Sequence, residues 1–297
     1  MSYVILDLEW NSAYSHSTHS FVNEIIEFGA VKTDDDFQII DTFDALIKPK
    51  ISKKLTGRVK RLTKLTNEKL REDGGSFFDI TRDFTDFLGD SVMITWGTTD
   101  LFTLMENYRY FARDSHIPFL KRYCDAQEYC EKAMDRYDEG KQIGLGACAE
   151  LLGVTFSEEE QHRADSDAEL TLKCMLQFTG TVSIAPFVRQ ADCQAFYDRL
   201  LFKNYFITDL HSPSVDRSQM KFRCDQCGGN ARQMKRWRLH NKSFVSDFCC
   251  KSCGRRFTGR VSFKQKYDEV KVNKRILEIS EKEKSDTRAD MQLPSSV

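Results

Sequence analysis

Two acidic residues stand one position apart at the end of an apolar run near the start of the chain, in the segment VILDLEWN. Acidic residues are poor strand formers, and burying a carboxylate is costly unless a cation or hydrogen bonds compensate. In a strand, residues i and i+2 project from one face, about 6.6 Å apart. The spacing of Asp7 and Glu9 therefore predicts that their carboxylates hold one divalent cation and reach toward a second one. The alternative is a strand end with two solvated acids.

Two further acids stand where helices are expected to begin. Asp100 follows a short apolar segment that ends at Trp96, and Asp167 opens a helical pattern. The dipole of a helix favours an anion at its N-terminus, so each acid taken alone is also explained by a favourable interaction with its own helix and no further role. His162 lies five residues before Asp167 on the preceding loop and is a candidate general base. Asp165 lies three residues after His162 and is the weaker candidate for the acidic position.

Four cysteines form two Cys-x2-Cys-Gly pairs, Cys224/Cys227 and Cys250/Cys253, with 22 residues between them. Two such pairs suit tetrahedral Zn²⁺. The glycine after each pair lets the chain turn so that backbone amides can approach the sulfurs. Cys249 is an alternative ligand that the spacing disfavours. Since the other cysteines are mostly scattered among apolar residues, the pattern predicts metal binding and buried thiols in a reducing cytoplasm rather than a disulfide framework.

The net charge of −1 hides a strong asymmetry along the chain. Residues 218–266 contain 13 Lys or Arg residues and 2 acids, whereas the first 217 residues carry a net charge of −11. Cations interleaved with aromatic side chains are what single-stranded nucleic acid binding needs. Protein docking and a purely structural role are the alternatives. The candidate nucleic-acid-binding residues in this segment are Arg236, Trp237, Arg238, Arg255 and Arg256.

The acids require a layered domain to bring them together. The chain begins with strand-like segments, continues with helical patterns around one further short strand, and thereby predicts an α/β or α+β domain that ends near residue 180. We expect Glu27, in the second strand, to face solvent. The expected strands are 3–9, 23–32, 37–47 and 92–96, and the expected helices are 66–71 (its start), 77–88, 101–111, 146–152 and 167–178.

The remaining chain divides by composition. We predict a first domain over residues 1–180, a partly helical linker over 181–217 and a basic zinc ribbon over 218–266. The charged residues 267–297 are expected to form a frayed helix and then to be disordered. No run of 18 apolar residues is present and the N-terminus lacks the features of a signal peptide, so we expect no membrane span and a cytoplasmic location.

The ordered set Asp7-x-Glu9, Asp100 and His162-x4-Asp167 resembles the DEDDh 3′→5′ exonucleases of the ribonuclease-H-like fold. The resemblance covers about residues 1–180. DLEWN and TWGTTD are more similar to the KapD/exoribonuclease-like branch than to the polymerase-proofreading branch. NEIIEFGAV is similar to the second strand of the family, and GLGACAELLGVTFSEEEQHRADSDAEL to the stretch before and through its third motif.

This resemblance implies an α/β fold with a mixed β-sheet flanked by helices, and a two-metal mechanism. Asp7, Glu9, Asp100 and Asp167 would hold two Mg²⁺ or Mn²⁺ ions, and His162 would take the proton from the attacking water. The expected substrate is single-stranded nucleic acid, with RNA favoured and nucleoside 5′-monophosphates as products. A DNA exonuclease in repair, or a KapD-like regulatory binding protein with incidental nuclease activity, are the alternatives. The resemblance also places Leu65 roughly where related nucleases wedge an apolar side chain against the terminal base, with core packing as the alternative.

Overall fold

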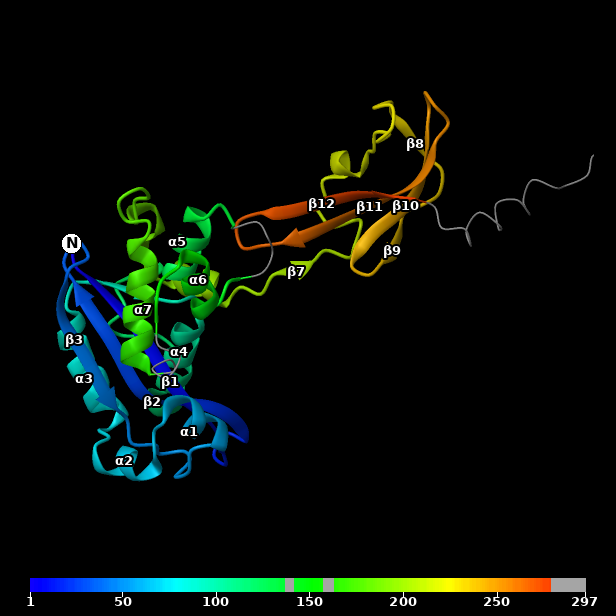
Figure 1. The fold of residues 1–297 in the computed structure, drawn as a ribbon. Coiled ribbons are helices and arrows are strands. Elements are labelled where there is room, and N and C mark those ends of the chain that lie inside the picture. Colours follow the sequence, from blue (N-terminus) through cyan, green and yellow to red (C-terminus); the bar gives the residue numbers. More distant parts are fainter. Residues whose placement is uncertain (137–141, 157–162, 279–297) are drawn as a thin grey trace, which may run out of the picture. The chain divides into compact units, whose positions relative to one another are not determined.

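The computed structural model describes residues 1–136, 142–156 and 163–278, and the chain forms two compact units, Met1–Leu200 and Leu201–Val297 (Figure 1). Among the described residues, no helix is both long enough and apolar enough to cross a membrane.

A six-stranded mixed sheet in the order β3-β2-β1-β4-β5-β6 forms the centre of the first unit. Its first three strands pair antiparallel in chain order, whereas β4 runs parallel to β1 and β5 runs parallel to β4. This confirms the predicted mixed sheet of an α/β fold. The strands are β1 (Tyr3–Ser15), β2 (Ser20–Thr33), β3 (Ile39–Leu46), β4 (Val92–Thr95), β5 (Arg122–Asp125) and β6 (Arg189–Gln190).

Helices of the first unit contribute to two hydrophobic clusters, one on each face of the sheet. Val4, Leu6 and Leu8 of β1 enter the cluster that contains residues of α3 and α4. Tyr3 and Ile5 enter the other cluster, with residues of α5, α6 and α7, because successive strand residues point to opposite faces. The helices are α1 (Gly57–Thr63), α2 (Asn67–Glu72), α3 (Phe77–Leu88), α4 (Thr99–Ala112), α5 (Ala126–Ala133), α6 (Leu145–Leu152), α7 (Ala164–Leu176) and α8 (Gln194–Leu201).

The second unit is built on another sheet, in which β12, β11, β10 and β8 are neighbours, β9 also pairs with β10, and β7 pairs with β11. Phenylalanines from the strands and from the preceding loop form its core. Asn241 and Lys242 both have positive φ angles, which a two-residue hairpin turn between β9 and β10 requires. The strands are β7 (Tyr205–Phe206), β8 (Ala231–Gln233), β9 (Arg238–His240), β10 (Ser243–Cys250), β11 (Arg256–Gln265) and β12 (Val270–Leu277).

The frayed helix expected after residue 267 is wrong as far as Leu277. Val270–Leu277 form β12, which pairs antiparallel with β11 from Val270 opposite Gln265 to Leu277 opposite Thr258. Val272 and Ile276 pack against the core of the unit, whereas the intervening Asn273 and Lys274 are exposed. The segment VKVNKRIL has only a partial alternation of apolar and polar residues, so the pairing with β11 decides its structure.

Candidate active site and metal centre

Three predicted acids meet on the face of the first sheet that is covered by α7. Asp7, Glu9 and Asp167 each offer a carboxylate oxygen, and these oxygens lie within 4.8 Å of one another. Asp7 and Glu9 continue the face of β1 that begins with Tyr3 and Ile5, and Asp167 lies in the first turn of α7. The structure therefore joins acids that lie 158 residues apart in the chain, between Glu9 and Asp167.

Asp100 lies in the first turn of α4, as predicted, and is 4% exposed. Its carboxylate accepts hydrogen bonds from the backbone of Leu8 and from its own backbone N–H. Its negative charge raises the pKa of Asp7, and the charge of Asp167 raises the pKa of Asp100. Asp100 is thus electrostatically linked to the other three acids.

Burial is the largest cause of the raised pKa values in this acid cluster, and repulsion between the carboxylates adds to it. The pKa of Asp7 rises well above its usual value through burial and the charges of Asp100 and Asp167. Burial and the charge of Asp167 raise the pKa of Glu9 to about 8, and burial raises that of Asp100 to about 7. Bound divalent cations would favour the ionised forms. Four clustered carboxylates are hard oxygen donors, which fit Mg²⁺ or Mn²⁺.

The expectation that Glu27 faces solvent is wrong. Its side chain is fully buried and accepts hydrogen bonds from Arg163 Nε at 2.8 Å and Nη2 at 2.6 Å. Arg163 is the residue immediately before α7, so this ion pair joins β2 to the start of the helix that carries Asp167. The pair was missed because the two residues are 136 positions apart and neither is unusual in its local sequence.

Gly29 on β2 makes a second close approach to the start of α7. A Cβ atom at this position would lie 2.0 Å from the carbonyl carbon of Ala164 and from the backbone nitrogen of Asp165. No side chain fits at that distance, so glycine is required there for steric reasons. Together with the Glu27–Arg163 ion pair, this contact fixes where α7 begins.

The other predicted residues of the first unit have different outcomes. His162 lies outside the residues that the structure describes, so its role as a base stays a prediction. Asp167, and not Asp165, belongs to the acid cluster, in agreement with the preferred spacing. Leu65 is 2% exposed and packs with Ile26, Leu55 and Leu70, so its packing matches the core alternative.

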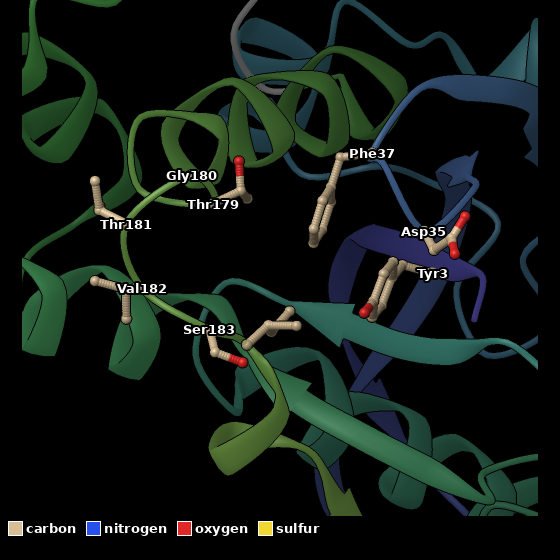
Figure 2. A pocket seen from close by; sticks show the side chains of 9 residues that line it. Tyr3, Asp35, Phe37, Thr179, Gly180, Thr181, Val182 and Ser183 are labelled. Carbon is tan, nitrogen blue, oxygen red and sulfur yellow. The ribbon is translucent and has the colours of Figure 1, made fainter.

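A separate cavity of about 390 Å³ lies beside the first residue of β1 (Figure 2). It is lined by Tyr3, Asp35, Phe37 and residues 179–184, and the rings of Tyr3 and Phe37 stack with their centroids 4.6 Å apart. None of the four acids lines this cavity. The acid cluster is therefore the better candidate for chemistry in this unit.

The four predicted cysteines of the second unit also meet. Their sulfur atoms are 3.4 Å apart for Cys227 and Cys250, 3.4 Å for Cys227 and Cys253, and 3.7 Å for Cys224 and Cys253. Tetrahedral zinc with bonds of about 2.3 Å separates its sulfur ligands by about 3.8 Å, so these thiols fit a zinc ion. Cys249 does not belong to this group.

The glycines after the two cysteine pairs have the predicted conformation. Gly228 has a φ of +68° and Gly254 a φ of +72°, which is the left-handed region that glycine adopts readily. Within the second pair, the backbone N–H of Ser252 donates a hydrogen bond to the Cys250 sulfur at 3.4 Å. Backbone hydrogen bonds of this kind stabilise thiolates, the form of cysteine that binds metal.

The predicted nucleic-acid-binding residues of the second unit separate into two groups. Trp237 packs against Phe222 and Phe248, with ring centroids 6.4 Å and 5.7 Å away, and Arg255 donates a hydrogen bond to Asp225 at 3.0 Å. These two side chains contribute to the structure of the unit itself. Arg236, Arg238 and Arg256 are exposed.

Comparisons with known proteins agree with this geometry. Residues 4–175 match the RNase_T family model, described as Exonuclease. The chain is 35% identical over 121 residues to the probable 3′-5′ exonuclease KapD of Bacillus subtilis (strain 168), a match that covers 40% of this chain and 56% of KapD. The chain thus spans about half the length of this curated relative.

Two solved structures share the fold of the first unit. A crystal structure of a full-length 3′-exonuclease is similar with a TM-score of 0.51, at 19% identity, and the match covers 60% of each chain. A structure of 3′-end specific recognition of a histone mRNA stem-loop by 3′-exonuclease has a TM-score of 0.52 at 19% identity, covering 64% of this chain and 84% of the other. At this level of identity the likeness shows the fold alone, which is the predicted ribonuclease-H-like fold.

Proposed function

The chain belongs to the RNase T exonuclease family, whose members include the DEDDh 3′-5′ exonucleases, and we propose that it hydrolyses nucleic acid from the 3′ end in a metal-dependent reaction. The observation that carries this proposal is the meeting of Asp7, Glu9 and Asp167 within 4.8 Å, with Asp100 linked to them by charge. Such a cluster is costly in a folded protein unless cations offset the repulsion, so its place in an exonuclease fold supports catalysis.

In this proposal the four acids hold two Mg²⁺ or Mn²⁺ ions. When bound, these ions activate the attacking water and stabilise the leaving 3′-oxygen. Asp7 and Glu9 are positioned by the alternation of β1, and Asp167 by the start of α7, which Glu27 and Arg163 hold against β2. His162 is the proposed base because the imidazole pKa lies close to neutral pH. The products would be nucleoside 5′-monophosphates.

We favour single-stranded RNA as the substrate. The motifs DLEWN and TWGTTD are similar to the exoribonuclease-like branch, and one structure with the same fold concerns recognition of a histone mRNA stem-loop. The second unit would bind the substrate, since residues 218–266 carry 13 cations and only 2 acids whereas the first 217 residues are strongly acidic. One Zn²⁺ at the four cysteines would have a structural role.

A degradation assay tests this proposal. Strands of RNA and DNA with one sequence and a 5′ label are incubated with the chain and Mg²⁺ or Mn²⁺. The proposal predicts a ladder that shortens from the 3′ end, faster on RNA, and absent for Asp7→Asn. This variant is a cleaner control than a chelator, which would also remove zinc from the cysteines. A ladder from the variant equal to that of the unaltered chain would contradict the proposal, and a stronger ladder on DNA would change the substrate class.

A further inference from the structure

The register of the second sheet assigns its residues to two faces with different chemistry. Directly opposed residues in neighbouring strands share a face, and successive residues alternate between faces. Phe248 opposes Phe257, and Phe244 opposes Val261, so these residues lie on one face, which forms the core of the unit. Residues between them, such as Val245 and Arg260, belong to the opposite face.

Cations from neighbouring strands are aligned across this opposite face. Val245 of β10 lies between Arg238 of β9 and Arg260 of β11, and Arg260 in turn opposes Arg275 of β12. Two parallel rows repeat the pattern. In one, Cys249 lies between Arg232 and Arg256, and in the other, Lys264 near the end of β11 opposes Lys271. The seven cations of this surface, which we name the cationic face, are Arg232, Arg238, Arg256, Arg260, Lys264, Lys271 and Arg275.

Two acids at or beside the cationic face interact with lysines: Glu269, in the turn between β11 and β12, interacts with Lys266 at 2.9 Å, and Asp247 lies on the face itself. Among the residues paired across the described strands, Asp247 is the acid on this face, and it is 8% exposed. It interacts with Lys235 at 2.9 Å and accepts a hydrogen bond from Thr258 at 3.2 Å. This carboxylate therefore does little to offset the positive charge of the neighbouring rows.

Most cations of the cationic face are exposed, and Arg260 and Lys264 are partly exposed, although the sheet beneath them is buried. Arg232, Arg256 and Arg275 are exposed, whereas Val245 between its flanking arginines is only 6% exposed. The apolar stems of long cationic side chains can cover such a residue while their charged ends remain in water. Strands lie about 4.8 Å apart, so Arg260 and Arg275, which are directly opposed on neighbouring strands, place two positive charges close together.

We propose that the cationic face binds the phosphate backbone of the nucleic acid substrate. This inference rests on the proposed function and identifies where the second unit contacts the strand. Arginines in rows favour a polyanion because each can neutralise a phosphate, and affinity then depends on salt. Phe206 opposes Lys264 on the same face and adds an aromatic ring beside the cations. The binding surface thus extends beyond Arg238 and Arg256, the two cations of this face among the candidate binding residues given in the sequence analysis.

Charge-neutralising pairs in the full chain test this proposal. All variants also carry Asp7→Asn, so that the labelled nucleic acid is not degraded during the measurement. Arg260→Gln with Arg275→Gln removes two charges from the cationic face. Arg223→Gln with Lys251→Gln removes two exposed charges from the same unit elsewhere. Binding of labelled single-stranded RNA and DNA is measured by fluorescence anisotropy over a range of salt concentrations. Zinc content and circular dichroism check that each variant keeps its fold.

The first pair is expected to weaken binding about tenfold and to reduce the slope of log K against log salt by about 1.4, since each phosphate contact contributes about 0.7 for a single strand. The second pair should change the dissociation constant less than twofold. If both pairs of substitutions weaken binding equally, or if the first pair has no effect, the proposal that the cationic face binds nucleic acid is overturned, while the exonuclease proposal stays intact. Binding of polyglutamate as tight as that of RNA, and equally sensitive to the first pair, would overturn the choice of nucleic acid. No binding to either strand would overturn the binding role of the whole second unit.

Discussion

The acid cluster of the first unit and the cysteine cluster of the second use the two ways in which a chain can assemble a metal site. The cysteines come from two short turns, Cys224–Cys227 and Cys250–Cys253, and each turn presents its own pair of sulfurs. The acids come from three separate elements, β1, α4 and α7, and meet only when the sheet and helices pack. The cysteine site is thus formed by two short turns that a bound metal ion joins. The acid site, in contrast, forms only when the sheet and helices have folded.

Loss of zinc should produce the largest effect, and it should be confined to the second unit. We predict that Cys227→Ser abolishes stoichiometric zinc binding and unfolds that unit, because structural zinc contributes about 10 kcal/mol to the folding of small domains. Calorimetry should then lose one transition and retain that of the first unit. Cys249→Ser is the matched control, because Cys249 lies outside the cysteine cluster and its substitution should leave both transitions. Simultaneous loss of both transitions in Cys227→Ser would contradict the contrast between the units.

Loss of one acid should affect the reaction and leave the fold. We predict that Asp7→Asn lowers the rate by about a thousandfold or more, equivalent to about 4 kcal/mol, since it removes a ligand of the proposed metals. Burial and neighbouring charges raise the pKa of Asp7, so the neutral amide should leave the free energy of unfolding of the metal-free chain unchanged or higher. Denaturant unfolding and a single-turnover rate measure both quantities. Strong destabilisation with an unchanged rate would show that Asp7 is structural.

The Glu27–Arg163 ion pair connects folding and chemistry. Burial raises the pKa of Glu27 and so offsets part of the gain from its pairing with Arg163. We therefore predict that Glu27→Gln lowers the free energy of unfolding by only about 1 kcal/mol, through the loss of the partner of an arginine that is 27% exposed. The rate should also fall, since the start of α7 positions Asp167. Glu169→Gln on the same helix breaks an exposed pair with Lys173 and should cost less than about 0.5 kcal/mol. Equal effects of the two substitutions in urea unfolding would show that the buried pair has no special role.

The pH dependence of stability should depend on whether metal is bound. Glu9 and Asp100 have pKa values raised to about 8 and about 7, so the folded chain holds protons that the unfolded chain has already lost. Their contribution to the stability of the chain without Mg²⁺ or Mn²⁺ is therefore full below pH 4 and is lost as the pH rises toward 8. Saturating Mn²⁺ should reverse this trend, because it binds the ionised acids. Thermal unfolding of the unaltered chain and of Glu9→Gln at several pH values measures the difference. An identical pH trend in the two proteins would contradict the assignment to Glu9.

Local patterns in the sequence predicted the local parts of both sites. Helical spacing of phenylalanines gave α3 over Phe77–Leu88, and alternation placed Asp7 and Glu9 on one face. The Cys-x2-Cys-Gly spacing identified all four cysteines that meet. These features depend on residues a few positions apart, which one strand or turn brings together by itself.

Features that depend on distant pairing could not be predicted in this way. The Glu27–Arg163 ion pair and the rows of the cationic face exist only because strands and helices adopt one register. The sequence analysis also missed β5 and α5, since Arg122–Asp125 is too short to show a strand pattern of its own. It pairs with β4, and its Asp125 side chain caps α5 by accepting a hydrogen bond from Glu128 N at 3.1 Å.

The most direct test of the central claim is to measure Mn²⁺ binding and release of the 3′-terminal nucleotide on the same samples of the full chain. We predict that two Mn²⁺ ions bind beyond the zinc, that nucleoside 5′-monophosphate release rises with their binding, and that Asp7→Asn and Asp167→Asn reduce both. Release of 5′-monophosphate by the unaltered chain without added divalent cation, or by both variants at the unaltered rate, would show that the acid cluster is not the catalytic centre.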